Sequence, residues 1–574
     1  MSGTATRDAA PALRRDTAPL SAARAFDAFL GRRDLAGGVV DAVRAIDLDE
    51  ASAFPTEEIA AIDAWGLQRW YVPEKHGGRL VDTLDPVLMI RHLAGRDVTA
   101  AVAHGKTFLG SVCSWVAGGE IAETTADIAL RGEPISWGLT EKGRGSDLSQ
   151  SSTTARVEAR EILLDGTKWP INNATRGRAV TVLARTSDAG GPRSLSLVFL
   201  DKAEVDPGTL SYEPKVATHG IRGADISGIR FSATRTAPER LVGQEGHGLE
   251  LVLKSLQLTR PLTTALSLGA ADQGLSIALS FARSRRLYGS LLIGLPAARR
   301  TLAEAAADTL IAECVMLVGA RTIHSAPDEM AIVSALVKFL APDTVDAMFR
   351  NLTSFLGARS QLVGFAGAGA FQKAARDNRV VGIFDGNSIV NLNVLINELP
   401  GQLRPADPPD LAALLAPLAL SWRTSGLPAQ SLRLVTRRGS SLLRAVPELV
   451  AAVTGRGGAE VAAAAQTIAD AYRSMVEDAA ALPRQGQPHP RAFRVAERLA
   501  VVFGGACAMA VYLARRDVVA DHFADGAWLS GVLQRIAQRL GAQPLSRGAT
   551  DTLLDAAVAA HETGVVSLLR GWSA

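Results

Sequence analysis

The feature that most constrains this chain is a change of pattern in its middle. Between about 134 and 242 the sequence contains short apolar runs rich in Val, Leu and Thr, such as AVTVLART and SLSLVFL, and ILLDGTKW predicts a hairpin centred on Asp165-Gly166. On both sides of this block, apolar residues recur at the three- and four-residue spacing of amphipathic helices. We therefore expect a mainly α protein with a central antiparallel β domain over 133–243.

The 574 residues are too many for a single hydrophobic core. We expect an N-terminal helical domain over 22–132 and, after the β domain, a helical bundle over 244–399. The segment 400–410, PGQLRPADPPD, contains four prolines and predicts a linker, because proline removes a backbone donor and interrupts helices. Residues 411–574 predict a C-terminal helical domain, and residues 1–21 predict a mobile tail.

Composition and charge exclude several classes of protein. A net charge of +3 without a dense Lys/Arg cluster argues against nucleic acid as a partner. The three cysteines show neither a disulfide framework nor metal-ligand spacing, so we expect a cytoplasmic protein without a metal site. The longest uncharged stretch, 499–514, falls short of the roughly 18 residues of a membrane-spanning helix. We interpret it as a buried helix, with peripheral membrane contact as the alternative.

Two short stretches carry groups suited to binding or catalysis. WGLTEKGRGSD (137–147) concentrates glycines with the hydroxyls of Thr140 and Ser146. Glycines let a backbone approach a planar or anionic ligand, and hydroxyls can donate to it, although an ordinary surface turn has the same composition. RDNRVVGIFDGNS (376–388) places one carboxylate, Asp385, between an apolar run and a glycine turn.

The order of these segments resembles that of the acyl-CoA dehydrogenase family of flavoproteins, over about residues 55–400. VPEKHGG resembles the family's Pro-Glu-x-x-Gly-Gly turn, and DISGIRFSATRTAPERLVGQEGHGLELVL resembles its exit from the β domain. LTRP followed by ARSRRLYG is similar to the first bundle helix, and RDNRVVGIFDGNS is similar to the segment that ends in Ile-Tyr-Glu-Gly-Thr. Residues 411–574 stand where the very-long-chain branch has an additional helical domain.

The resemblance implies FAD, held in part by residues of the β domain. Thr140 and Ser146 match hydroxyls beside the flavin and the substrate, and Trp169 matches a tryptophan that packs against the isoalloxazine. The chain also departs from the family here. Ile171 stands at a flavin-contacting threonine, so the resemblance predicts one hydrogen bond fewer, and Arg144 replaces a small or apolar residue of the glycine loop.

The helical bundle contributes the remaining residues that the resemblance assigns to FAD. Arg285 matches an arginine that contacts the cofactor pyrophosphate, usually that of a neighbouring subunit, and a guanidinium suits phosphate oxygens. Tyr288 stands where phenylalanine is common. The resemblance also assigns Gly386 and Asn387, which follow Asp385, to FAD binding.

In the family, a glutamate at the position of Asp385 abstracts the pro-R α proton of an acyl thioester while hydride leaves the β carbon for flavin N5. The resemblance therefore makes Asp385 the catalytic base, although its carboxylate is withdrawn by about one C–C bond, roughly 1.5 Å. The alternative is that Asp385 caps the next helix, a role for which aspartate is among the preferred residues. Arg222 and Arg260 are candidate substrate-binding residues, with structural ion pairs as their alternative.

The leading hypothesis is FAD-dependent dehydrogenation of an acyl thioester, on CoA or on an acyl carrier protein, to the α,β-unsaturated product. The resemblance implies an electron-transfer flavoprotein as acceptor. Two alternatives stay open: a flavin oxidase or monooxygenase on the same scaffold, including the nitroalkane-oxidising type with an aspartate base, and a non-catalytic acyl- or flavin-binding relative. We expect a homodimer, because the apolar content of 411–574 needs its own core or another subunit.

Overall fold

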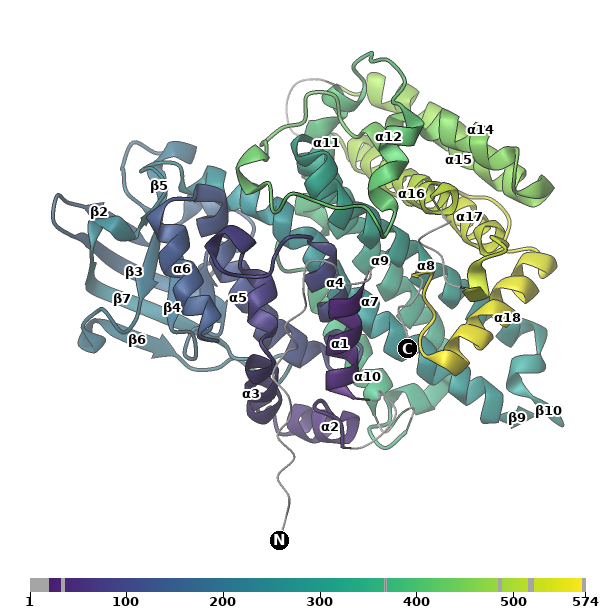
Figure 1. Cartoon of the computed structure of the whole chain (residues 1–574), viewed down its shortest axis with the longest axis horizontal. Helices are drawn as coiled ribbons and strands as arrows, with labels where there is room; N and C mark the ends of the chain where they lie inside the picture. Colours follow the sequence, from purple (N-terminus) through teal and green to yellow (C-terminus); the bar gives the residue numbers. More distant parts are fainter. Residues whose placement is uncertain are drawn as a thin grey trace, which may run out of the picture. The chain divides into compact units, whose positions relative to one another are not determined.

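The computed structural model describes residues 20–31, 37–365, 367, 369–483, 488–514 and 521–569. Most of the tail predicted over 1–21 therefore lies outside the described residues. The chain forms two compact units, whose helices and strands are labelled in Figure 1. Unit 1 consists of Met1–Met89, Thr99–Ser255 and Ser425–Gln430, and unit 2 consists of Ile90–Val98, Leu256–Thr424 and Ser431–Ala574.

Unit 1 begins with short helices whose ends follow local signals. Asp41 caps the second helix, because its carboxylate accepts hydrogen bonds from the backbone N–H groups of Val43 and Arg44. Gly66 ends the third helix in the left-handed conformation that glycine adopts without strain. These helices are α1 (Ser21–Leu30), α2 (Ala42–Glu50), α3 (Thr56–Trp65), α4 (Leu84–Ala94), α5 (Val98–Ala117) and α6 (Glu120–Leu130).

The predicted β domain is an eight-stranded sheet in unit 1. Its strand order is β6-β7-β3-β2-β4-β5-β8, with β1 paired to β4. Most neighbours are antiparallel, as predicted, but β1 and β2 each pair with β4 in parallel. The strands are β1 (Ile135–Gly138), β2 (Thr154–Val157), β3 (Ile162–Asn172), β4 (Ala179–Arg185), β5 (Leu195–Asp201), β6 (Leu210–Glu213), β7 (Ile226–Thr236) and β8 (Leu241–Val242).

The hairpin predicted at Asp165-Gly166 is wrong. Strand β3 continues through both residues, and its pairing with β7 shifts register between Leu164 and Gly166. The glycine is explained by crowding, because a Cβ at Gly166 would lie 2.7 Å from the Cα of Thr153. Asp165 stabilises the same irregularity by accepting a hydrogen bond from the Ala233 N–H at 2.7 Å. The Asp-Gly pair therefore marks a β-bulge rather than a turn.

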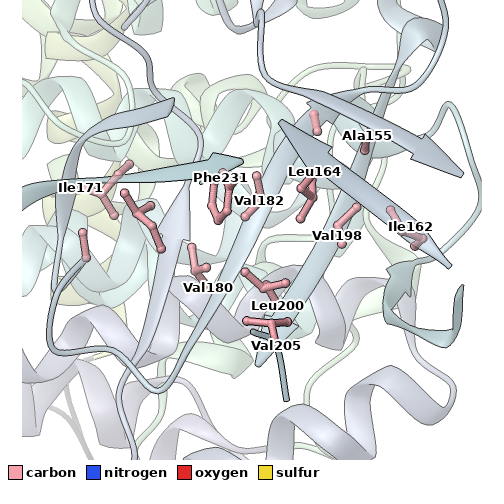
Figure 2. Close-up of a cluster of buried hydrophobic side chains, with 13 residues drawn as sticks. Ala155, Ile162, Leu164, Ile171, Val180, Val182, Val198, Leu200, Val205 and Phe231 are labelled. Atoms are coloured by element: carbon pink, nitrogen blue, oxygen red, sulfur yellow. The ribbon is translucent and has the colours of Figure 1, made fainter. Parts of the chain in front are cut away.

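A cluster of buried apolar side chains forms the core of the sheet (Figure 2). It draws on β2, β3, β4, β5 and β7, and Leu164, Val182, Leu200 and Phe231 are among its members. Ile171, near the end of β3, belongs to the same cluster and is only 2% exposed.

Unit 2 contains the predicted bundle. Proline at the first position of α8 suits a helix start, where no N–H donor is needed. The predicted linker 400–410 begins inside a helix, because Pro400 lies in the last turns of α11. The elements are α7 (Gly248–Ser284), which begins in unit 1, the hairpin of β9 (Arg286–Leu287) and β10 (Ser290–Leu291), α8 (Pro296–Ser325), α9 (Met330–Leu356), α10 (Ala370–Val381) and α11 (Ser388–Gln402).

The C-terminal region is helical, as predicted, and packs on the bundle within unit 2. Helices α16, α17 and α18 contact α8, and Arg535 of α17 forms a buried ion pair with Asp308 of α8 at 2.8 Å. The helices are α12 (Leu411–Leu415), α13 (Ser441–Arg444), α14 (Val446–Thr454), α15 (Gly458–Ala480), α16 (Pro490–Leu513), α17 (Trp528–Arg539) and α18 (Arg547–Thr563).

Helix α16 contains the uncharged stretch singled out in the sequence. It is long and apolar enough to cross a membrane by length and composition, but 83% of its most apolar window is buried inside the protein. Gly504 and Gly505 lie in its middle, where a Cβ would approach Leu340 and Ile468 to 2.8 and 2.9 Å. The helix is therefore packed as a core helix, in agreement with the buried-helix interpretation.

Candidate active site

The turn between α10 and α11 carries Asp385. The apolar end of α10 leads into it, and the N–H groups of Ile383 and Phe384 both donate to the Val380 carbonyl, at 2.9 and 3.1 Å. Asp385 then adopts a left-handed backbone with φ of 55°, and Gly386 follows with φ of 98°. Aspartate tolerates this region better than most residues, and glycine tolerates it best. The sequence Asp-Gly thus suits a sharp reversal before α11.

The N-cap of α11 is Asn387. Its side-chain oxygen accepts a hydrogen bond from the Val390 N–H at 2.9 Å. The alternative that Asp385 caps this helix is therefore wrong, because the cap lies two residues further along the chain. Asn387 has a structural role in the turn, and its assignment to FAD stays a prediction.

Two buried cations lie beside the turn, and both donate to its backbone. Arg260 of α7 donates through Nε to the Asp385 carbonyl at 3.3 Å. Lys338 of α9 donates through Nζ to the carbonyls of Val381 at 2.6 Å and Gly386 at 3.3 Å. A Cβ at Gly386 would lie 3.1 Å from Nη2 of Arg260, so glycine keeps the guanidinium close.

Burial governs the electrostatics of these cations. It lowers the pKa of Arg260 to about 10, and Asp385 acts in the opposite direction. Burial lowers the pKa of Lys338 to about 7, again against the effect of Asp385, and Arg260 lowers it further. Two cations and one carboxylate are therefore coupled at this turn.

The carboxylate of Asp385 is left with an unused oxygen. Its Oδ2 is buried and accepts no hydrogen bond from any residue that the structure describes. Buried carboxylate oxygens are almost always paired, so an unpaired one beside two cations is an exception that needs a reason. The arrangement leaves a negatively charged acceptor free for another molecule.

In unit 1, the glycine-rich loop after β1 is held by Glu141. This carboxylate accepts hydrogen bonds from the backbone and hydroxyl groups of Ser152 and Thr153 at 2.6–2.9 Å. It also pairs with the buried Lys168 at 2.8 Å. Burial acts to raise the pKa of Glu141, but Lys168 and these donors hold it well below its usual range. Arg144 adds a brace by donating to the Gln150 carbonyl at 2.6 Å.

We expect Glu141→Gln to lower the melting temperature of the protein by roughly 5 °C at pH 7, since hydrogen bonds to a charged group are lost. The folded pKa of Glu141 lies below its ordinary 4.5, so its stabilisation is complete above about pH 4.5 and declines as the pH falls further. Calorimetry should show a smaller difference in melting temperature between Glu141→Gln and the wild type at pH 4 than at pH 7. Glu158→Gln, which removes an exposed carboxylate of the same sheet, is the control. An unchanged difference at the two pH values would contradict the assignment.

Thr140 and Trp169 lie together at one end of this loop. The Trp169 N–H donates to the Thr140 carbonyl at 3.0 Å, and the Thr140 hydroxyl donates to the Pro170 carbonyl at 3.1 Å. Both side chains are partly exposed, and Trp169 lies over Gly228 of β7, where a Cβ would meet its ring at 3.0 Å. Ser146 is exposed in the loop. The indole of Trp169 and the hydroxyls of Thr140 and Ser146 are groups that can bind a flat aromatic ligand.

Ile171 is a buried member of the sheet core (Figure 2). The expectation that one flavin hydrogen bond is missing at this position stays a prediction. The next residue, Asn172, has a buried Oδ1 without a hydrogen-bond partner among the described residues, while its Nδ2 donates to Val102 at 3.2 Å. Strand alternation at a bulged strand is difficult to assign from sequence, because one extra residue exchanges the two faces.

Arg285 and Tyr288 share the hairpin after α7. Tyr288 (φ 52°) and Gly289 (φ 81°) both have positive φ, which is typical of a two-residue type I′ turn. Tyr288 is 95% exposed and Arg285 is partly exposed. A guanidinium and an exposed ring on one hairpin suit the phosphate and aromatic parts of a dinucleotide, so these two residues by themselves fit part of FAD.

Arg222 is engaged elsewhere in unit 1. It pairs with Glu50 at 3.3 Å and lies 3.8 Å from Asp49, both at the end of α2. These contacts favour the structural alternative for Arg222. Of the residues predicted in unit 2, Asp385, Gly386, Asn387 and Arg260 do come together.

Sequence reasoning missed Lys338 and Glu141. A single lysine inside the apolar run MAIVSALVKFLAP was a usable signal, because an ammonium is rarely buried without a purpose. For Glu141 the signal was the cluster of hydroxyl residues SQSSTT ten residues later. Among the described residues, no group of three or more His, Cys, Asp or Glu side chains is arranged to hold a metal ion.

Comparison with known proteins agrees with this architecture. Residues 136–234 match the family model described as acyl-CoA dehydrogenase, middle domain, and residues 246–399 match the model described as acyl-CoA dehydrogenase, C-terminal domain. The chain is 25% identical to the probable acyl-CoA dehydrogenase FadE25 of Mycobacterium leprae over 360 residues. This alignment covers 62% of this chain and 91% of the relative.

Two solved structures show the extent of the shared fold. Butyryl-CoA dehydrogenase from Megasphaera elsdenii has a TM-score of 0.56 at 21% identity and covers 65% of this chain and 95% of its own. An acyl-CoA dehydrogenase complexed with FAD from Bacillus anthracis has a TM-score of 0.65 at 17% identity and covers 91% of this chain and 89% of its own. The second alignment extends over the C-terminal helices as well.

The relatives and structural neighbours indicate a flavin-dependent oxidoreductase that acts on CH–CH groups. Residues 136–234 and 246–399 match the middle and C-terminal domains of the acyl-CoA dehydrogenase family. The predictions of the family, the fold class, the enzyme class and FAD as cofactor are confirmed at this level.

Proposed function

We propose that the protein oxidises a saturated acyl thioester to its α,β-unsaturated product, with Asp385 as the catalytic base. The observation that carries this proposal is the buried, unpaired Oδ2 of Asp385, at the turn where family members carry their base. The cations beside it donate to backbone carbonyls instead of to this oxygen. The oxygen is therefore available to accept a proton.

In the proposed reaction, the α C–H bond breaks and its proton moves to Oδ2 of Asp385, while the electron pair of that bond forms the new C=C bond. The β C–H bond breaks with its electron pair. FAD, when bound, supplies the acceptor for that hydride. A carboxylate within reach of the α C–H group acts here as a general base.

The chain's residues divide the remaining tasks. Thr140, Ser146 and Trp169 would hold the ring system of FAD, and Arg285 with Tyr288 would hold its phosphate and adenine parts. Arg260 fixes the Asp385 backbone by donating to its carbonyl.

The test is an anaerobic titration of the purified holoprotein with saturated acyl thioesters of increasing chain length, followed by flavin absorbance. Bleaching by one class of thioester is the expected result and identifies that class. A flavin spectrum that no thioester changes would overturn the proposal. Rapid oxygen consumption with a nitroalkane would instead favour the oxidase alternative, to which an aspartate base at this position is suited.

We also propose a cytoplasmic homodimer that passes electrons to an electron-transfer flavoprotein. The dimer is supported by exposed apolar side chains in unit 2, among them Leu362, Val363 and Phe365. Light scattering during gel filtration tests the dimer, and a monomer mass at micromolar concentration would contradict it. Cell fractionation tests the location, and recovery in the membrane fraction would favour peripheral membrane contact.

A further inference from the structure

The turn 381–386 is anchored through its own carbonyl groups. Lys338 donates to the carbonyls of Val381 and Gly386, which bracket the turn, and Arg260 donates to the carbonyl of Asp385 between them. Asn391 adds a second donor to Gly386 at 2.8 Å. Three carbonyls of one turn thus face two cations. A short turn held at both ends and in the middle has little freedom to change conformation.

Lys338 is unusual among these donors. It is 1% exposed, lies 5.5 Å from the centre of the Phe384 ring, and has no ion pair with any carboxylate in the described part of the chain. Burying an ammonium without a carboxylate partner opposes folding. An apolar side chain of similar length would fill the same volume without that penalty. The ammonium is therefore best explained by what its two hydrogen bonds hold.

The conformation being held is a left-handed one. Asp385 has φ of 55°, a region that residues with a side chain adopt much less often than the right-handed one, although aspartate adopts it more readily than most. The side-chain direction at this position follows from that backbone. If the turn relaxed to a right-handed conformation, Oδ2 would move, and a displacement of about 1 Å is enough to slow a positioned reaction about a hundredfold.

We propose that Lys338 is a positioning residue that holds the turn 381–386, and with it the Asp385 carboxylate, in the conformation required for proton abstraction. The catalytic part of this inference rests on the proposed function of Asp385. The anchoring of the turn is independent of it. In this role Lys338 acts only through the backbone of the turn.

Lys338→Met tests the inference, because methionine approximates the length of the side chain but cannot donate. Two quantities are measured on the holoprotein: hydrogen–deuterium exchange of peptides covering 376–395, and the rate of flavin reduction by the best thioester. We expect amide exchange within 381–391 to accelerate at least tenfold, while exchange within α9 stays unchanged. We also expect flavin reduction to slow by tenfold to a hundredfold, while binding of a non-oxidisable thioester analogue changes less than twofold.

Two further variants separate the possible roles. Lys338→Gln keeps two N–H donors on a side chain that is one bond shorter, and we expect intermediate exchange. Arg539→Met removes a cation that contacts α9 through Asp343 at 2.6 Å but does not touch the turn, and we expect wild-type exchange within 381–391. The exchange of Lys338→Gln and Arg539→Met can be measured and compared even if Lys338→Met is poorly folded.

The outcomes decide between the proposals. Unchanged exchange within 381–391 in both Lys338 variants would overturn the inference, and so would a uniform increase across the bundle, which would indicate general stability instead. If no thioester reduces the wild-type flavin but Lys338→Met loosens only this turn, the proposed function fails while the anchoring role stands. Asp385→Asn should leave exchange in the turn unchanged, because it removes the acceptor and keeps every anchoring bond.

Discussion

Replacing Asp385 with Asn is expected to lower turnover of the best acyl thioester by about three orders of magnitude, since a positioned general base contributes about 10²–10⁴-fold. Asparagine has nearly the same shape and keeps the backbone bond to Arg260, but its amide cannot accept the α proton. Stopped-flow reduction of the flavin measures the chemical step directly. FAD content and the affinity for a non-oxidisable thioester should stay within twofold of wild type.

Asp385→Glu is the matched control for this loss. It restores the carboxylate of the family pattern and extends it by roughly one C–C bond, about 1.5 Å. Glutamate tolerates the left-handed backbone at this position less well than aspartate, so we expect activity to be retained at about a tenth of the wild-type rate or above. Wild-type turnover by Asp385→Asn would refute the base assignment outright.

Much of this turn was predictable and part of it was not. The sequence indicated a helical bundle over 244–399 and a glycine turn at Asp385, and the structure has α10 and α11 on the two sides of that turn. The identity of the cap was not predictable, because Asp385 and Asn387 are both good N-cap residues and only the backbone angles decide between them. Lys338 lies on a different helix, and no local pattern connects a distant lysine to this turn.

The β domain shows the same limit. Its strands were recognised from their Val-, Leu- and Thr-rich runs, but the Asp165-Gly166 pair predicted a hairpin where the structure has a bulge. The reason is tertiary: the glycine is required by the neighbouring backbone of Thr153, which is not visible in a local pattern. The same bulged strand carries Ile171 into the core. A local pattern therefore recognises the strand but not its bulge, and the assignment of this segment to the flavin stays a prediction.

Unit 2 also contains a buried ion cluster that no motif indicated. Arg91 of α4 is fully buried and forms two hydrogen bonds of 2.8 Å with Asp272 of α7. It also pairs with Glu313 of α8, which in turn accepts a hydrogen bond from the Leu568 N–H at 2.6 Å. Burial acts to lower the pKa of Arg91, but the two carboxylates raise it above its ordinary value. One guanidinium thus joins three helices and the segment that follows α18.

Arg91→Met is expected to destabilise unit 2 by about 3–5 kcal/mol, because removing one partner of a buried ion pair leaves an uncompensated buried charge. Here two carboxylates, Asp272 and Glu313, lose their counterion at once. The measurement is urea unfolding followed by tryptophan fluorescence and circular dichroism. We expect the first unfolding transition to shift to a lower urea concentration. The circular dichroism signal should fall in that transition as the C-terminal helices unfold.

Arg299→Met provides the matched control, because Arg299 also bridges two carboxylates, Asp551 at 2.7 Å and Asp555 at 2.9 Å, but in partly exposed positions. Solvent-screened pairs of this kind contribute about 0–1 kcal/mol. The double variant Arg91→Met with Asp272→Asn should recover part of the loss, since it removes one of the stranded charges. Equal, small effects of Arg91→Met and Arg299→Met would mean that water reaches the cluster and that the C-terminal helices are held by apolar packing alone.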